Sequence, residues 1–309
     1  MEARATDETA IFERPASQPL SVTRSIIAFA GSDRRGLVGG IILILYIVIA
    51  LMGPGISPHD LNAPNLEVRM QAPSRAHWLG TDRIGRDVLT RIIAGSQVSL
   101  QVAAGAVVMA LMLGAPLGAL GSYVGGTFDA LVQRVMEGIM AFPSLVLALA
   151  LVALAGPSVI ILWFAIAFSS IPRYARLVRS GVLTQKEREY VDAARALGQS
   201  PIRILLKQIL PNIMAPIAVQ ITLDFARAIS VEASLSYLGL GLSVPYISWG
   251  TMIRDAQDFL EVAPWLAIFP GMALAGVILA FTLVGDALRD RMDPRLRSSL
   301  SRRLRDRPE

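Results

Sequence analysis

The sequence predicts an all-α integral membrane protein with six transmembrane helices. Of its 309 residues, 53% are hydrophobic and only 17% are charged, which is too apolar a balance for an ordinary soluble domain. Lipid obliges the backbone to satisfy its own hydrogen bonds, and the apolar runs lack the alternation of a β-barrel, so helices are expected. Four uncharged runs are long enough to cross a core of about 30 Å: Gly36–Pro58, Ile92–Phe128, Gly138–Pro172 and Val262–Gly285.

The lengths of these runs and the gaps between them fix the number of helices. The run 138–172 is too long for one straight span, and Gly156-Pro157-Ser158 marks a turn inside it. Two helices fit there if the first begins near Asp129. A further span has to fit between Lys207 and Arg254. The expected helices are therefore 37–56, 97–122, 130–155, 158–181, 212–235 and 264–288.

The distribution of basic residues predicts which side of the membrane each loop faces. Of the 29 Lys and Arg residues, 22 fall in segments that would share one side with the two termini. Cytoplasmic loops retain an excess of Lys and Arg, so both termini are expected in the cytoplasm. This gives a cytoplasmic N-terminal tail 1–35, a transmembrane domain 36–290 with outer loops 57–95 and 236–263 and a cytoplasmic loop 182–211, and a basic cytoplasmic C-terminal tail 291–309.

Charge and cysteine content exclude several classes of function. The net charge of +5 is spread over loops and no folded basic domain is evident, so it indicates membrane orientation and not nucleic-acid binding. The chain has no cysteine, which excludes disulfides, thiolate metal sites and a cysteine nucleophile. His59 and His77 stand alone in the first outer loop without a supporting carboxylate spacing, so no metal site is predicted.

The cytoplasmic loop 182–211 has the pattern of two short helices joined by a glycine. In the first, Tyr190, Ala194 and Leu197 are predicted to share one face. Gly198 suits a left-handed helix C-cap, and Ser200-Pro201 is a typical start of the second helix, which Pro211 would close before the fifth span opens. Such an elbow can dock a cytosolic protein, or it can be an amphipathic hairpin on the lipid surface.

The elbow motif resembles that of a known family. Asp192-Ala193-Ala194-x-x-x-Gly198 with Leu210-Pro211 is similar to the Glu-Ala-Ala loop of permease subunits in binding-protein-dependent ABC importers. Aspartate replaces the usual glutamate, which keeps the charge and shortens its reach. Further segments resemble the second, C-type permease of dipeptide, oligopeptide and nickel importers: His77–Asp87, Glu232–Gly241, Trp249–Met252 and Gly285–Pro294.

The resemblance covers about residues 30 to 297 and implies a function. We expect the type I permease fold of ABC importers, in a bacterial cytoplasmic (inner) membrane, and import of peptides, with nickel complexes or glutathione as alternative cargo. The resemblance implies a paralogous permease subunit, two cytosolic ATP-binding subunits and an extracytoplasmic substrate-binding protein. It assigns coupling to the ATPases to Tyr190, Asp192, Ala193, Ala194, Leu197, Gly198, Leu210 and Pro211.

The chain has no phosphate-binding loop of its own. Its only two lysines, Lys186 and Lys207, follow Gln185 and Leu206, whereas such a loop needs Gly-Lys-Ser or Gly-Lys-Thr. The chain is therefore expected to be a transport subunit and not an enzyme. It should bind no cofactor, because ATP and Mg²⁺ would belong to the partner ATPases.

Three charged residues fall inside the fifth span. Asp224 and Arg227 lie near its middle and Glu232 lies nearer the outside. Each costs about 2.5–3.5 kcal/mol at the bilayer centre, so these side chains should face protein or water. They either line the path for a zwitterionic peptide or form an ion pair that holds helices together. Both interpretations stay open from the sequence.

One further helix is predicted in the first outer loop. The segment 82–93 has an apolar side, and Arg83, Asp87 and Arg91 are spaced to pair at i,i+4. We expect it to lie on the membrane or to meet a delivered binding protein.

Two other functions fit the membrane topology less well. A self-powered secondary transporter would need no elbow for a partner, and no inverted repeat is evident. An intramembrane hydrolase would need a membrane histidine or facing aspartates, and the sequence predicts neither.

Overall fold

In the computed structural model the described residues are 34–61, 63–242 and 245–292. The two predicted tails lie outside them, apart from the residues at either end that belong to helices. Within the described residues the chain is helical, and its one extended pairing is an isolated bridge between Thr81 and Asp87. This confirms the predicted all-α class.

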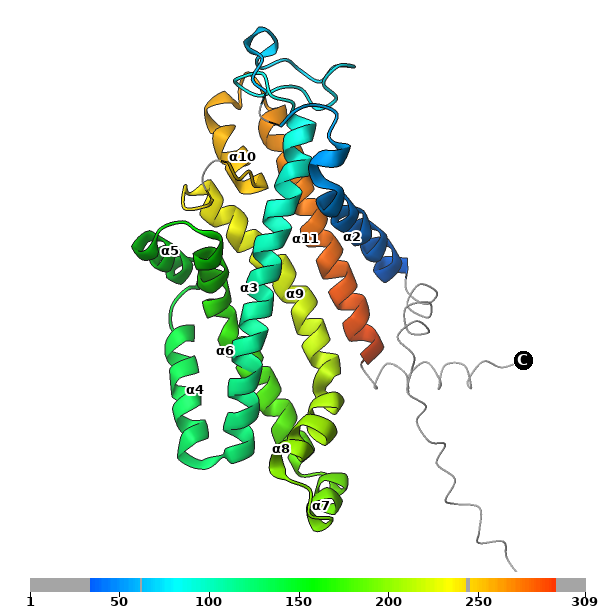
Figure 1. The fold of residues 1–309 in the computed structure, drawn as a ribbon, viewed down its shortest axis with the longest axis vertical. Coiled ribbons are helices and arrows are strands. Elements are labelled where there is room, and N and C mark those ends of the chain that lie inside the picture. Colours follow the sequence, from blue (N-terminus) through cyan, green and yellow to red (C-terminus); the bar gives the residue numbers. More distant parts are fainter. Residues whose placement is uncertain (1–33, 62, 243–244, 293–309) are drawn as a thin grey trace, which may run out of the picture.

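Most helices are joined by short turns, and longer connections precede α3, α10 and α11 (Figure 1). Their bounds are α2 Arg34–Met52, α3 Val88–Val124, α4 Gly126–Met140, α5 Ser144–Ala155, α6 Val159–Lys186, α7 Glu189–Ala196, α8 Pro201–Ile204, α9 Leu210–Tyr237, α10 Trp249–Asp255 and α11 Trp265–Met292. Short 3₁₀ turns occupy Gly53–Ile56, Leu66–Val68 and Gln257–Phe259, and a π-helical turn occupies Leu205–Ile209.

The long helices agree with the predicted spans. By length and apolar composition five helical segments of the described chain can cross a membrane: α2, α3, α6, Pro201–Tyr237 and α11. The pair α4 and α5 brings the number to six if it is counted as one span. The helix α2 leaves large apolar side chains such as Ile41, Ile44 and Leu51 exposed, as contact with lipid requires.

The third predicted span, 130–155, is not one straight helix. It is divided into α4 and α5, whose axes are bent by 88°. The break lies at Ala141–Pro143, and Pro143 is the N-cap of α5 with φ −56° and ψ 129°, which is not a helical conformation. A residue before proline avoids the helical conformation, which explains why the helix ends before Pro143. The uncharged composition of the run conceals this break.

The predicted amphipathic helix 82–93 is also wrong in its first half. Residues 82–87 form a turn closed by the Asp82 carboxylate, which accepts hydrogen bonds from the backbone N–H of Ile84 at 3.0 Å and of Arg86 at 2.9 Å. The helix begins only at Val88. The i,i+4 pairs predicted through Asp87 are therefore not formed, and Arg91 instead lies 3.6 Å from Asp82.

The helix α3 is the central element of the fold. It contacts α2, α4, α6, α9, α10 and α11. Its closest partner is α6, and glycines allow this approach: a Cβ at Gly114 would lie 2.5 Å from the Ile171 carbonyl oxygen, and one at Gly118 would lie 2.1 Å from that of Ala175. Gly114-x-x-x-Gly118 is thus a small-residue seam of the kind that brings membrane helices together.

Candidate coupling surface and buried charge cluster

The elbow α7–α8 lies at the opposite end of the molecule from the loop that precedes α3 and from α10 (Figure 1). The buried face of α7 consists of Val191 and Ala194, which belong to one apolar cluster with Ile204, Leu205 and Ile209 of the following helix. Of the three residues predicted to share one face, only Ala194 is buried, because Tyr190 and Leu197 are exposed by 37% and 80%. Val191, and not its neighbour Tyr190, packs inward.

The turn between α7 and α8 confirms the prediction that Gly198 is a left-handed helix C-cap. Its backbone has φ +73°, and its N–H donates to the Arg195 carbonyl at 2.9 Å while the Gln199 N–H donates to that of Ala194 at 3.1 Å. These two bonds define a Schellman C-cap. Nothing lies within 4 Å of a Cβ built on Gly198, so the requirement for glycine is one of backbone conformation.

The outward face of the elbow carries the remaining predicted coupling residues. Asp192, Ala193, Leu197 and Gly198 are all exposed. Asp192 pairs with Arg195 at 2.8 Å, on a surface where such a pair contributes little to stability. Ala194, by contrast, is only 5% exposed. The structure therefore brings together a small surface with one acidic, one small and one apolar side chain.

The elbow is joined to two long helices. On the α6 side, the Tyr190 hydroxyl lies 2.8 Å from Gln185 Oε1, and the Arg188 N–H donates to the Gln185 carbonyl at 3.1 Å. On the α9 side, helical structure runs without a break from Pro201 to Tyr237. A displacement of the elbow would thus act on both α6 and α9.

The expected break at Pro211 is absent. Leu210 and Pro211 occupy the first turn of α9, where a missing proline N–H is tolerated. Just before them the π-helical turn Leu205–Ile209 widens the helix, and the Leu210 N–H donates to the Leu205 carbonyl. Such single π turns are frequent at functional sites. The second short helix and the fifth span therefore form one continuous helical rod, Pro201–Tyr237.

The charged residues in the middle of α9 form a cluster with a residue of α6. Asp224 is 1% exposed and pairs with Arg227 one turn away. Arg173 of α6 lies 3.4 Å from the same carboxylate. Two guanidinium groups thus share one carboxylate, and the formal charges of the three side chains sum to +1. Arg173 and Arg227 stay 27% and 40% exposed, so the cluster reaches the surface of the chain.

Sequence reasoning missed Arg173. A signal was available, because this arginine lies inside the predicted span 158–181, where a charge needs a partner. Only the packing of α6 against α9 shows which carboxylate it meets.

Glu232 is not part of this cluster. It is 1% exposed, and its carboxylate accepts hydrogen bonds from the Ser99 hydroxyl at 3.1 Å and the Ser236 hydroxyl at 2.7 Å. Ser99 also accepts a bond from the Trp249 backbone N–H at 3.4 Å. The carboxylate thus links α9 to α3 and, through Ser99, to α10.

The two histidines are not isolated, contrary to the expectation from their sequence positions. Their ring centroids lie 4.7 Å apart, and both rings face the carboxylate of Asp87. The loop fold brings together residues that are 18 and 10 positions apart.

Comparison with known proteins places this arrangement in a family. The model of the "Binding-protein-dependent transport system inner membrane component" family matches residues 106–298, which is more than half of the chain. The chain belongs to this family. Residues 32–73 match a second family model, the N-terminal TM domain of oligopeptide transport permease C.

Similar proteins match most of the chain. The chain is 43% identical to the dipeptide transport system permease protein DppC of Alkalihalophilus pseudofirmus, over 86% of this chain and 88% of that protein. It is 39% identical to the di/tripeptide transport system permease protein DppC of Pseudomonas aeruginosa, over 94% of this chain and 99% of that protein. The glutathione transport system permease protein GsiD of Pectobacterium atrosepticum is 38% identical, over 84% and 86%.

A solved structure supports the fold. The MetNI methionine ABC transporter, in inward facing conformations, aligns with a TM-score of 0.56 at 16% identity, over 66% of this chain and 98% of the MetNI chain. Together with the apolar helices, the matches confirm the predicted permease family, its ABC importer fold and a multi-pass inner-membrane location.

Proposed function

We propose that this chain is the C-type permease subunit of an ATP-driven peptide importer. In this proposal it forms the pathway together with a paralogous permease, receives peptide from an extracytoplasmic binding protein and is moved by two cytosolic ATPases. Family membership supports the transport role, and the names of the similar permeases support a dipeptide or tripeptide as cargo. Glutathione, itself a tripeptide, is the second candidate cargo because of the similarity to a glutathione permease.

The observation that carries the coupling proposal is the shape of the elbow. Its inner face is fixed to the rod Pro201–Tyr237 by Val191 and Ala194, and its outer face presents Asp192, Ala193 and Leu197. ATP-driven closure of the ATPases would displace α7, and the rod would tilt with it. For this to change access to the pathway, the two orientations of the rod must bind the ATPases differently.

The pathway proposal rests on the charge cluster. A net positive charge at membrane depth suits the carboxylate end of a zwitterionic peptide, and the partly exposed Arg227 supplies an accessible guanidinium group. Asp224 would keep both arginines oriented. Glu232 has a different part in this proposal, because its buried carboxylate would hold α3, α9 and α10 together.

The coupling proposal is tested by two substitutions at Gly198. The left-handed conformation costs a residue with a Cβ about 1–2 kcal/mol, and a β-branched residue tolerates it least. We expect Gly198→Val to lower ATP-dependent dipeptide uptake by about tenfold or more in proteoliposomes that contain the whole importer. Gly198→Asn is the matched control, since asparagine accepts this conformation at a helix C-cap, and it should keep most of the uptake.

Two outcomes would contradict the proposal. One is uptake at the wild-type rate by Gly198→Val in membranes that contain equal amounts of protein. The other is dipeptide uptake by the wild type without ATP or without the ATPase subunits, which would point to a self-powered transporter.

A further inference from the structure

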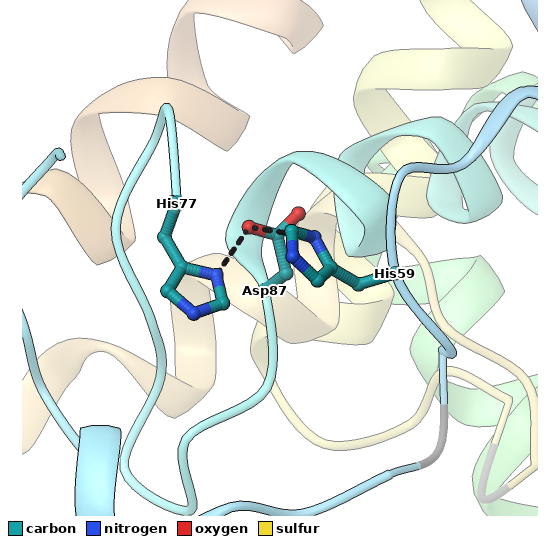
Figure 2. A group of neighbouring side chains, drawn as sticks. All are labelled: His59, His77 and Asp87. Atoms are coloured by element: carbon teal, nitrogen blue, oxygen red, sulfur yellow. Dashed lines mark hydrogen bonds and ion pairs between the residues drawn. The ribbon is translucent and has the colours of Figure 1, made fainter. Parts of the chain in front are cut away.

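Three side chains with metal-binding atoms converge where the first loop meets α3 (Figure 2). His59 comes from the segment that follows α2, His77 from the middle of the loop, and Asp87 from the residue just before α3. The Asp87 side chain is 1% exposed, that of His77 14% and that of His59 40%. The site is thus buried on the carboxylate side and open on the side of His59.

The distances suit a small tetrahedral ion. His77 Nδ1 lies 3.0 Å and His59 Nδ1 3.7 Å from the same oxygen, Oδ1 of Asp87. Ligands at the usual 2.0–2.1 Å from Zn²⁺ are about 3.3 Å from one another in a tetrahedron, between these two values. One ligand atom from each of the three residues lies within 4.8 Å of the others, so a small movement of the exposed His59 would close the set.

Two of the three ligands are held in place by their surroundings. The second oxygen of Asp87 accepts the Thr90 N–H at 2.8 Å and caps α3, which leaves Oδ1 facing the rings. The His77 backbone lies in a tight turn, where its N–H donates to Ser74 Oγ at 3.1 Å and its carbonyl accepts the Gly80 N–H at 3.0 Å. The bond from Thr90 is a fixed outer partner of the carboxylate, and such a partner orients a metal ligand and strengthens binding.

We propose that His59, His77 and Asp87 bind a divalent cation of the Zn²⁺ class. Two imidazoles and one carboxylate favour Zn²⁺ and similar transition metals over Mg²⁺ or Ca²⁺, which prefer oxygen ligands. The open side leaves the fourth position to water. The ion would tie the segment after α2 and the loop to the N-terminus of α3. This inference does not depend on the identity of the cargo or on coupling to ATPases.

The test is direct metal binding by the full chain. The protein is purified in detergent through an affinity tag without histidine and titrated with Zn²⁺ against a chromophoric chelator. We expect one additional ion per chain relative to His59→Ala and to His77→Ala, each of which should weaken this site by about 100-fold or more, since loss of an outer partner alone costs 10–100-fold. Glu67→Gln, an exposed carboxylate of the same loop, is the matched control and should bind as the wild type does.

A second measurement separates a built site from chance binding. Zn²⁺ bound only by the folded state raises the melting temperature, so we expect a rise for the wild type and for Glu67→Gln, and none for His59→Ala. The exposed His59 can be removed without disturbing the cap of α3. Equal Zn²⁺ binding by the wild type and both histidine variants, or no binding by the wild type, would overturn the proposal.

Discussion

At the scale of single residues, the most informative group is the carboxylate of Asp224. It is shared by Arg227 on its own helix and by Arg173 on α6. A buried ion pair whose charges cancel would suffice to hold two helices, whereas the third charge leaves the cluster with a net +1. An uncompensated charge in a span is costly, and under the pathway proposal this excess positive charge would bind the anionic end of the cargo.

Substitution of Asp224 by asparagine separates a pathway role from a structural one. The variant leaves two arginines without a counter-charge. Both are partly exposed, and in the proposed pathway they would face water, so the cost to folding should be small there. We expect ATP-dependent dipeptide uptake to fall by about tenfold. The abundance of the permease in the membrane should stay close to that of the wild type, and the ATPases should still bind. The measurement is uptake normalised to the amount of permease.

The double variant Asp224→Asn/Arg227→Gln tests the structural alternative. It removes one charge of each sign, so a purely structural pair predicts a loss of abundance in the single variant that the double variant restores. Such a restoration, with normal uptake per molecule, would exclude Asp224 from the pathway.

At the scale of elements, the contact between α3 and α6 determines where the elbow and the charge cluster lie. Arg173 lies in α6, and the elbow follows α6 directly. The helix α6 is in turn held against α3 through Gly114 and Gly118. At both glycines an added Cβ would meet backbone atoms. Backbone cannot move aside as a flexible side chain can, so the two helices would have to separate.

Two glycine substitutions with opposite expected signs test this seam. Gly118→Ala should destabilise the protein by about 1–3 kcal/mol, as overpacking does. Gly138→Ala on α4 is the matched control, because nothing lies within 4 Å of its added Cβ, and alanine in a helix should stabilise by about 0.5–1 kcal/mol. Thermal denaturation in detergent measures both. Equal stability of the two variants would contradict the importance of the seam.

The elements also show how far the sequence could predict this fold. Uncharged length alone predicts α2, α3 and α11, because each must satisfy its backbone in lipid, whereas α6 also needs the turn at Gly156-Pro157-Ser158. The same criterion cannot show the bend at Pro143, which depends on a local steric conflict inside an apolar run. Residues 82–87 have a helical period, yet the Asp82 side chain competes for the backbone N–H groups and forms a turn.

In the candidate site, too, local features could be predicted from the sequence, whereas contacts between distant residues could not. Gly198 could be assigned from the sequence, because a left-handed cap is a local property of the chain. The inward side chain of α7 could not, because Tyr190 and Val191 are both apolar enough and only packing in the cluster with Ile204, Leu205 and Ile209 decides between them. The clusters of Asp224 with Arg173 and of His59 with His77 join residues distant in sequence, and no spacing rule indicates them.

At the scale of the whole molecule, the elbow and the loop before α3 lie at opposite ends (Figure 1). The helix α3 has 37 residues, about 55 Å at 1.5 Å per residue, so it exceeds a hydrocarbon core of about 30 Å. Its ends must lie beyond the core or the helix must tilt. In the orientation expected from the basic residues, the elbow would face the cytoplasm, where the proposed ATPases would bind, and His59 and His77 would face the outside.

The absence of cysteine from the chain makes this orientation testable with single thiols. Ala76 in the loop and Ala193 on the elbow are both exposed alanines, so they form a matched pair. We expect a membrane-impermeant maleimide to label Ala76→Cys on spheroplasts and to label Ala193→Cys only after permeabilisation, while the cysteine-free wild type stays unlabelled. Bound ATPases should then slow the labelling of Ala193→Cys severalfold, because they would cover that face. Labelling of Ala193→Cys from the outside would reverse the topology, and a rate unaffected by the ATPases would place their contact away from the elbow.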